Sequence, residues 1–274
     1  MTATAWLASY PKSGNTWLRA LLNALELDSD PEINALDVGR GHDGLDPWLG
    51  ISLSNLDESE AISIQRRSWA SGAPEEPGFH RRKTHQAWVP AADGFPIRWQ
   101  PDGARAIYLV RDPRAVAVSW AHHNGISHRE SVDSLAGRGE IGSSAWFTHD
   151  PHADRNPGQW TQHVVSWRDQ TDLPVLFLTY EQLSANTVEA LHEISDWLMM
   201  DADEAACARA VERCTFTRLA AREVSEGFIE AAAADRVFFR RGQIDSWRDE
   251  LSSDLVAQIE KDHGSLMREL GYLN

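Results

Sequence analysis

A short polar turn near the start of the chain, residues 11–16 (PKSGNT), has the residue types of an anion-binding site. Gly14 lets the backbone approach a ligand, Ser13 can cap a following helix, and the free N–H groups of that helix's first turn attract negative charge. Lys12 adds a point charge and Thr16 a hydroxyl. Because the lysine precedes the glycine, the pattern differs from the nucleoside-triphosphatase loop and calls for no metal ion. The turn is predicted to bind phosphate.

The elements on either side must position this turn. Residues 5–9 are a short apolar run ended by proline, which predicts a buried strand, and the apolar residues of 17–25 recur at helical spacing. The segment is therefore expected to be strand, tight turn and helix. Such a connection is also common without any ligand, so the turn alone leaves both interpretations open.

A second polar set ends the next predicted strand, residues 79–85. Its last residues, Lys83, Thr84 and His85, would reach the sheet edge where ligands gather in parallel α/β proteins. An imidazole with an ordinary pKa near ~6.5 can act as a general base at neutral pH. A single histidine is more often structural, so His85 also needs its context.

Arg111 follows the strongly apolar run 104–110, which is expected to be the central strand. A helix then begins at Asp112 and Pro113, because proline is favoured at the first helical position. The planar guanidinium of Arg111 suits bidentate binding of a phosphate. The alternative is a surface ion pair with Asp112 or another carboxylate.

Four motifs in this order resemble the sulfotransferases that use 3′-phosphoadenosine 5′-phosphosulfate (PAPS). They are the turn at 11–16, Lys-Thr-His at 83–85, Arg111 with Ser119, and the run Phe-Arg-Arg-Gly at 239–242. The resemblance covers about residues 5 to 250. It implies an α/β fold, with a single domain over 1–274 and a mostly parallel central sheet flanked by helices, whose first strand, turn and helix bind phosphosulfate.

The resemblance also implies a role for each matching residue. His85 would take the proton from the acceptor hydroxyl, Lys12 would face the charge developing on the leaving phosphate, and Lys83 would assist at the transferring oxygens. PAPS would be held, and adenosine 3′,5′-bisphosphate (PAP) released, without a metal. The predicted donor-binding residues are Lys12, Ser13, Gly14, Asn15, Thr16, Trp17, Arg111, Ser119, Tyr180, Cys214, Phe216, Arg240, Arg241 and Gly242.

Two positions depart from the family pattern. Cys214 replaces a hydroxyl residue on the adenine side, which puts one hydrogen bond in doubt, and Asp245 and Ser246 replace a Gly-Asp pair before Trp247. The adjacent residues Arg240 and Arg241 would, without the family context, be a solvated patch.

Residues 125–158 show little periodicity and are expected to be a loop that covers the acceptor, as in the family. Trp146, Phe147 and Trp160 are the candidates for stacking on an acceptor ring. The run 149–154 contains two histidines and two aspartates, but Pro151 spoils a regular presentation, and a solvated loop is the interpretation we adopt. Further strand and helices are expected at 173–179, 159–170, 189–198, 203–214 and 251–270.

The composition of the chain limits the classes of molecule it is expected to bind. The 274 residues carry a net charge of −15, which disfavours nucleic acid, acidic membranes and polyanionic acceptors. No apolar run reaches the length of a membrane span and no signal-peptide pattern is present, so a cytoplasmic enzyme is expected. Cys207 and Cys214 are expected to be buried free thiols. The acceptor is expected to be a small-molecule hydroxyl: a phenol, an alcohol or a natural product.

Two other functions use the same kind of sheet. A nucleotide-dependent kinase would need the Lys-Ser/Thr closing a triphosphate loop, which is absent. A catalytically inactive nucleotide-binding module would keep the arginines, but the presence of Lys12 and His85 counts against it. Nothing in the sequence sets the oligomeric state.

Overall fold

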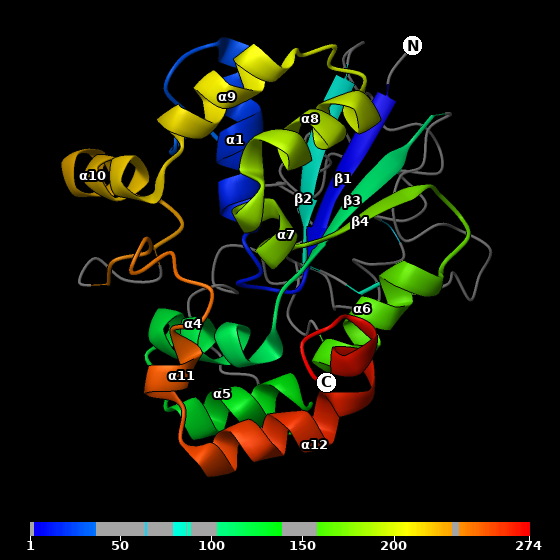
Figure 1. Ribbon diagram of the computed structural model, residues 1–274, viewed down its shortest axis with the longest axis vertical. Coiled ribbons are helices and arrows are strands. Elements are labelled where there is room, and N and C mark those ends of the chain that lie inside the picture. The colour runs from blue at the N-terminus through cyan, green and yellow to red at the C-terminus, as the bar shows by residue number, and fades with distance from the viewer. Residues whose placement is uncertain are drawn as a thin grey trace.

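The computed structural model describes residues 3–36, 64, 79–85, 87–88, 103–138, 158–231 and 236–274. A four-stranded sheet in the order β2-β1-β3-β4 forms the centre of these residues, and all three strand pairs are parallel (Figure 1). The strands are β1 (Ala3–Ser9), β2 (Phe79–Thr84), β3 (Arg105–Val110) and β4 (Val175–Thr179). The predicted α/β class with a parallel sheet is confirmed.

Each central strand faces two separate hydrophobic clusters. Leu7 of β1 and Leu109 of β3 belong to one cluster, while Trp6 and Tyr108 on the same strands belong to the other. This division follows from the period of two in a strand, in which successive side chains point to opposite faces. Both faces are buried, which explains why 104–110 reads as a continuous apolar run rather than an alternating one.

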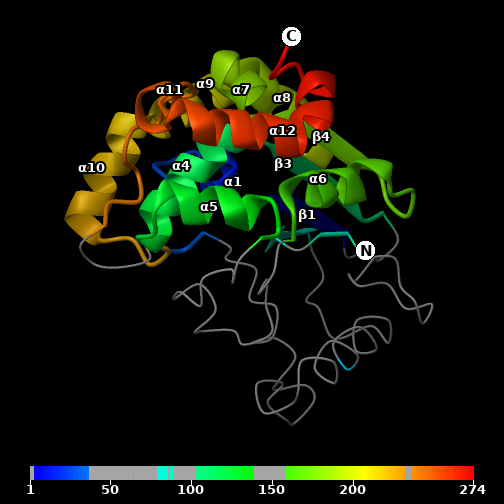
Figure 2. The same ribbon diagram turned by 90° about the horizontal axis from the view of Figure 1, so that it is seen from below.

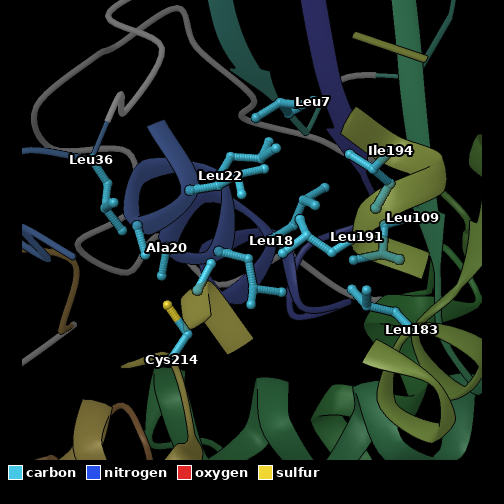
Figure 3. Packing of buried hydrophobic residues seen from close by; sticks show 14 of the residues in the cluster. Leu7, Leu18, Ala20, Leu22, Leu36, Leu109, Leu183, Leu191, Ile194 and Cys214 are labelled. Atoms are coloured by element: carbon cyan, nitrogen blue, oxygen red, sulfur yellow. The ribbon is translucent and has the colours of Figure 1, made fainter. Parts of the chain in front are cut away.

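Helices α1, α7, α8 and α9 build the first cluster. Their bounds are α1 (Asn15–Leu27), α7 (Tyr180–Ala185), α8 (Thr187–Leu198) and α9 (Glu204–Arg213), followed by α10 (Phe216–Glu226). Figure 3 shows Leu18 and Leu22 of α1 meeting Leu191 and Ile194 of α8 beside the strands. This packing fixes the start of α1, and hence the polar turn, against the end of β1.

The second cluster joins the sheet to α4, α5, α6, α11 and α12. These are α4 (Pro113–Asn124), α5 (His128–Leu135), α6 (Trp160–Asp169), α11 (Trp247–Glu250) and α12 (Ser253–Glu269). Helices α4, α5 and α12 lie side by side beyond the carboxyl ends of the strands (Figures 1 and 2). The active-site edge of the sheet therefore faces a helical layer.

One expected loop contains a helix. Residues 125–158 were predicted to lack regular structure, but α5 occupies 128–135. The Ser127 hydroxyl accepts the N–H of Glu130, whose carboxylate accepts the N–H of Ser127, so a capping box begins the helix. The Ser-x-x-Glu signal was present in the sequence and was overlooked. Trp146, Phe147 and residues 149–154 lie outside the described residues.

Helices α7 and α10 were also not predicted. Helix α7 is six residues long, too short for a hydrophobic period to show, although Thr179 and Gln182 form a capping box at its start. In the described part of the chain, no helix has the length and apolar character needed to cross a membrane. Cys207 and Cys214 are buried free thiols, as predicted.

Candidate active site

The strands end at one edge of the sheet, and a cavity of about 370 Å³ opens there. Every predicted catalytic or donor-binding residue except Ser13 and Lys83 lines it. The lining comes from the turn before α1, the end of β2, the β3–α4 and β4–α7 connections, the start of α10 and the segment 236–246. Residues more than 200 positions apart thus face one space.

The polar turn is built around two residues with positive φ. Lys12 has φ 66° and Gly14 has φ 98°. A Cβ on Gly14 would collide with the Tyr180 ring, so the glycine permits both the backbone conformation and the close approach of that ring. Gly14 itself is the N-cap of α1 and no side chain caps the helix, so the predicted Ser13 cap is wrong. The Ser13 hydroxyl is buried and has no hydrogen-bond partner among the described residues.

The side chains of Asn15 and Thr16 are engaged in hydrogen bonds to other protein groups. Asn15 donates to the Leu7 carbonyl at 2.9 Å and accepts from Arg19 Nε at 3.0 Å, which fastens α1 to β1. The Thr16 hydroxyl accepts from Arg19 Nη2 at 3.0 Å and donates to Glu230 at 3.4 Å. Both residues line the cavity, and the uncapped start of α1 places their backbone at the anion-binding position.

Lys12 is crowded by other cations. Its Nζ lies 3.4 Å from His123 Nδ1 and 3.9 Å from the centroid of the Phe238 ring. Desolvation lowers the pKa of Lys12 to about 7, against the opposing charge of Glu230, and Lys83 and Arg111 contribute to the fall. Lys12 therefore changes its charge near neutral pH.

His85 is buried at the end of β2. Its Nδ1 lies 2.8 Å from the Ser9 carbonyl oxygen, which can only accept, so Nδ1 carries the proton and Nε2 keeps the lone pair. Burial lowers the pKa of His85 well below 6.5, and the nearby Lys83 charge adds to this. A neutral imidazole whose Nε2 carries a lone pair is what a general base requires.

Lys83 does not line the cavity. Its Nζ lies 3.3 Å from Glu230 Oε2, and the Arg19 guanidinium contacts the same carboxylate at 2.8 Å. Glu230 was not among the predicted residues, because it lies in no recognisable motif. Glu230 also contacts the polar turn, because its Oε2 accepts from the Thr16 hydroxyl at 3.4 Å.

Arg111 stacks on Tyr180, with the guanidinium carbon 4.4 Å from the ring centroid. Its Nη1 donates to the Lys12 carbonyl at 3.2 Å and its Nη2 to the Gln243 carbonyl at 3.4 Å. The alternative of an ion pair with Asp112 is wrong, since Asp112 pairs with Arg114 at 2.7 Å. Within the described parts of the chain no carboxylate pairs with Arg111, and its charge faces the cavity that Ser119 also lines.

Arg240 and Arg241 share one carboxylate. Glu250 of α11 accepts two 2.7 Å hydrogen bonds from Arg240 and lies 3.3 Å from Arg241 Nη1. Gly242 follows with φ 63°, and a Cβ there would collide with the Phe216 ring. The pair of arginines is thus held in place beside the cavity rather than spread as a solvated patch.

Aromatic side chains form another part of the cavity lining. Trp17 meets Tyr180 edge to face with centroids 5.6 Å apart, and its indole N–H donates to the Cys214 carbonyl at 3.0 Å. Burial raises the pKa of the Cys214 thiol to about 12, so the thiol stays neutral. Phe216 completes a surface suited to a flat ring.

One expected acceptor residue is elsewhere. Trp160 is fully buried in α6, where it packs edge to face on His263 at 5.4 Å, so it is a core residue and not an acceptor contact. Conversely, His123 and Phe238 line the cavity without having been predicted. His123 follows Ser119 by one helical turn, and this spacing is the signal that was present in the sequence.

The family can now be stated from comparison with known proteins. The family model described as "Sulfotransferase domain" matches residues 3–271. The chain belongs to the sulfotransferase family. This confirms the family indicated by the four motifs, and with it the prediction of an enzyme that uses PAPS.

Relatives of this sulfotransferase come from animals and plants. Sulfotransferase 1B1 of Mus musculus is 26% identical over 259 residues, covering 93% of this chain and 79% of the relative. Flavonol 3-sulfotransferase of Flaveria bidentis is 21% identical over 271 residues, with the same coverages of 93% and 79%. Cytosolic sulfotransferase 16 of Arabidopsis thaliana is 25% identical over 273 residues, covering 93% and 73%.

Two solved structures share the fold. Mouse sulfotransferase SULT7A1 complexed with PAP superposes with a TM-score of 0.61 at 20% identity, covering 97% of this chain and 85% of that one. Retinol dehydratase in complex with retinol and PAP gives 0.60 at 21% identity, covering 96% and 81%. In the described residues of this sulfotransferase, no group of three or more His, Cys, Asp or Glu side chains is placed to hold a metal ion.

Proposed function

We propose that this sulfotransferase moves a sulfuryl group from PAPS to the hydroxyl of a small-molecule acceptor, with His85 as the general base, and releases PAP. The observation that carries the proposal is the position of His85. A neutral imidazole, oriented through Nδ1 by the Ser9 carbonyl, lines the same cavity as Lys12 and the uncapped start of α1. A base and an anion site therefore meet in one space.

The donor would lie across the cavity. The N–H groups at the start of α1 and the Lys12 ammonium would hold the phosphosulfate, since both favour negative charge. Arg111, Ser119 and the Arg240–Gly242 segment would hold the 3′-phosphate, and Trp17, Tyr180 and Phe216 would pack on the adenine. The proposed arrangement matches the cationic and aromatic side chains that line the cavity.

Transfer would then proceed in line. The acceptor oxygen forms a bond to sulfur as the bond between sulfur and the bridging phosphate oxygen breaks. The acceptor proton passes to His85 Nε2, and the leaving phosphate oxygen takes the electron pair. Charge develops on that oxygen beside Lys12, where a preorganised cation stabilises the transition state. The lining of the cavity by both His85 and Lys12 supports this proposal.

The acceptor class is supported by the relatives. Flavonol 3-sulfotransferase is named for a flavonol, and retinol dehydratase was solved with retinol, both of them small hydroxyl compounds. We propose a small acceptor of this kind rather than nucleic acid or a membrane surface, and a cytoplasmic location, in keeping with the relatives named cytosolic sulfotransferases. The net charge of −15 disfavours polyanionic partners.

The test is calorimetric titration with PAP, beside ATP with magnesium, on wild type and Arg111→Ala. The proposal predicts metal-independent binding of PAP that weakens strongly in Arg111→Ala, and little response to ATP. Transfer of label from PAPS to a panel of phenols and alcohols follows. Tight binding of magnesium–ATP without preference for PAP would contradict the donor site, and PAP binding without transfer to any acceptor would indicate an inactive nucleotide-binding module.

A further inference from the structure

Glu230, which belongs to none of the predicted motifs, lies against the polar turn. Its Oε2 contacts Arg19 Nη2 at 2.8 Å, Lys83 Nζ at 3.3 Å and Thr16 Oγ1 at 3.4 Å, and its Oε1 accepts a second bond from Arg19 at 2.8 Å. Its side chain is only 10% exposed. The carboxylate thus joins α1, β2 and the segment after α10 at the edge of the proposed donor site.

Positive charge is concentrated around this carboxylate. Arg19, Lys83, Arg111 and Glu223 interact electrostatically with Lys12 or Glu230, and His123 contacts Lys12. Around them, His85 interacts with Lys83 and Arg19, and His122 and Arg236 interact with His123. Burial alone would raise the pKa of Glu230, but the charges of Lys83 and Arg19 outweigh it and lower that pKa to about 2. Glu230 is therefore ionised at any pH at which the protein would work.

Lysine and histidine cations held together in a poorly solvated site lose protons unless a negative charge is present. Glu223 also carries a carboxylate, but both of its oxygens accept backbone N–H groups, from Phe238 and Phe239. Glu230 instead contacts the side chains of the cationic cluster directly. It is the counter-charge built into the cluster.

We infer that Glu230 is a positioning residue for sulfuryl transfer: its carboxylate holds the Lys83 ammonium at the edge of the turn and supplies the negative charge that offsets the cations around Lys12. The inference deepens the proposed function and rests on it. A neutral Lys12 amine could not stabilise charge on the leaving phosphate. Glu230 would not touch donor or acceptor, and acts through the lysines.

A contrary interpretation predicts a different outcome. Glu230 could be an internal anion that occupies the place of the donor's phosphosulfate, since Thr16 and Lys83 are among its contacts. Removing its charge would then tighten donor binding. If Glu230 supports Lys12 and Lys83, removing its charge weakens donor binding and transfer.

The test compares Glu230→Gln with a matched control, Glu260→Gln. Glutamine keeps the size and an oxygen that can accept from Arg19, but removes the charge. Glu260 likewise contacts a buried arginine, Arg114, at 2.8 Å, and it does not line the cavity. A loss of stability from weakening an arginine–carboxylate pair is expected in both variants, so that effect is separated from the one on the lysines.

The first readout is NMR of lysine labelled with ¹³C at Cε, since the chain has three lysines, Lys12, Lys83 and Lys261. In Glu230→Gln the titration midpoint of Lys12 is expected to fall by about one pH unit from that of the wild type. Lys261 on α12 is the internal reference and should not change, and Glu260→Gln should leave Lys12 unchanged. An unaltered Lys12 titration in folded Glu230→Gln would overturn the inference.

The second readout is the pH profile of kcat/KM for PAPS. Wild-type activity should decline as pH rises through the Lys12 midpoint, and in Glu230→Gln this alkaline limb should move to lower pH. At pH 8 the variant should be about tenfold slower than wild type, with activity recovering as pH falls. Tighter PAP binding with undiminished transfer would instead identify Glu230 as a competitor of the donor and contradict the inference.

A conservative variant covers a failure of Glu230→Gln to fold. Glu230→Asp keeps the charge but withdraws it from Lys83, so it should give a smaller fall of the Lys12 midpoint, and no change would overturn the inference. The lysine titration needs no substrate. Absence of PAP binding or transfer in wild type would therefore contradict the proposed function alone, whereas an unchanged lysine titration would contradict the role of Glu230 alone.

Discussion

At the scale of single residues, the site depends on histidine and lysine side chains whose charges are set by burial. His85 is kept neutral, and its proton is fixed on Nδ1 by the Ser9 carbonyl. Lys12 lies close to its own titration point because desolvation and neighbouring cations oppose its charge. Burial thus leaves His85 as a neutral base and makes Lys12 a cation that titrates near neutral pH.

His85→Ala is expected to lower the rate of transfer by about 10²–10⁴-fold while leaving PAP binding unchanged, because a base contributes to the chemical step and not to donor affinity. Because burial lowers the pKa of His85, wild-type activity should show no loss as pH falls through 6.5 and should drop only at more acid pH. Initial rates and PAP calorimetry across this range check both points. His192→Ala, at an exposed histidine of α8, is the control; equal rates for the two alanine variants would disprove the role of His85.

PAP binding is expected to be coupled to proton uptake at Lys12. At pH 8 the free amine is largely neutral, since its pKa is lowered to about 7, and a bound phosphate favours the charged form. Calorimetry in buffers of different ionisation enthalpy should show uptake approaching one proton at pH 8 and little at pH 6. Lys12→Met should abolish the uptake, and persistence of uptake in that variant would place the proton on another group.

At the scale of elements, the turn between β1 and α1 depends on the contact between Gly14 and the Tyr180 ring. Gly14→Ala introduces a Cβ that collides with this ring at φ 98°, whereas Gly103 has φ 86° with open space where a Cβ would lie. Both alanine variants should lose about 1 kcal/mol of stability from the left-handed backbone.

The two glycine variants should differ in binding. Only Gly14→Ala should also weaken PAP binding, because the displaced Tyr180 ring supports Arg111 and lines the cavity. Thermal denaturation and PAP calorimetry on the two variants separate the backbone cost from the steric one. Equal PAP affinity in Gly14→Ala and wild type would show that the ring's position is not critical.

Helices and strands could be predicted from the sequence where their apolar residues recur at regular spacing. The four strands and helices α1, α4, α6, α8, α9 and α12 were predicted, and apart from the polar strand β2 most of them show an apolar run or a helical stripe. The short helices α5 and α7 depend on capping boxes at Ser127 and Thr179, which occupy few residues and leave little periodic signal.

The site was predictable where a motif carried it. The turn, Lys-Thr-His, Arg111 and the Phe-Arg-Arg-Gly run all lie at or beside the cavity. Glu230 was not predicted, because it acts through a contact between segments far apart in sequence, that of Lys83 with Glu230. A sequence motif does not show which distant segments come into contact in the fold. The misassigned Trp160 is the reverse case, in which an aromatic suited to a ligand is buried in the core.

At the scale of the whole molecule, the end of the chain is fastened to the active-site edge of the sheet. The Tyr272 hydroxyl donates to Glu181 Oε2 at 2.8 Å, and Glu181 Oε1 accepts the Asp112 N–H at 3.2 Å. Arg114 in turn donates to the Tyr272 carbonyl at 2.9 Å. The residues after Arg111 and Tyr180 are thereby held together by the C-terminal segment.

Tyr272→Phe should lower the free energy of unfolding by about 1–2 kcal/mol, since it leaves a largely buried carboxylate without one of its donors. PAP affinity should fall as well, because Asp112 and Glu181 adjoin Arg111 and Tyr180. Denaturant titration of Tyr272→Phe, Glu181→Gln and the double variant measures the coupling between the two side chains. Additive losses would show that the hydrogen bond does not stabilise the fold.

The cavity wall is drawn from both layers that enclose the sheet. Trp17 and Phe216 lie against the cluster on one face, while Val118 of α4 belongs to the cluster on the other, and all three line the same space. A molecule bound there contacts both layers and stabilises the folded protein. At a ligand concentration a hundred times Kd, the free energy of unfolding rises by about 2.7 kcal/mol. Melting-temperature scans with PAP already bound therefore offer a label-free way to find the acceptor, since any compound that fits beside it should raise the temperature further.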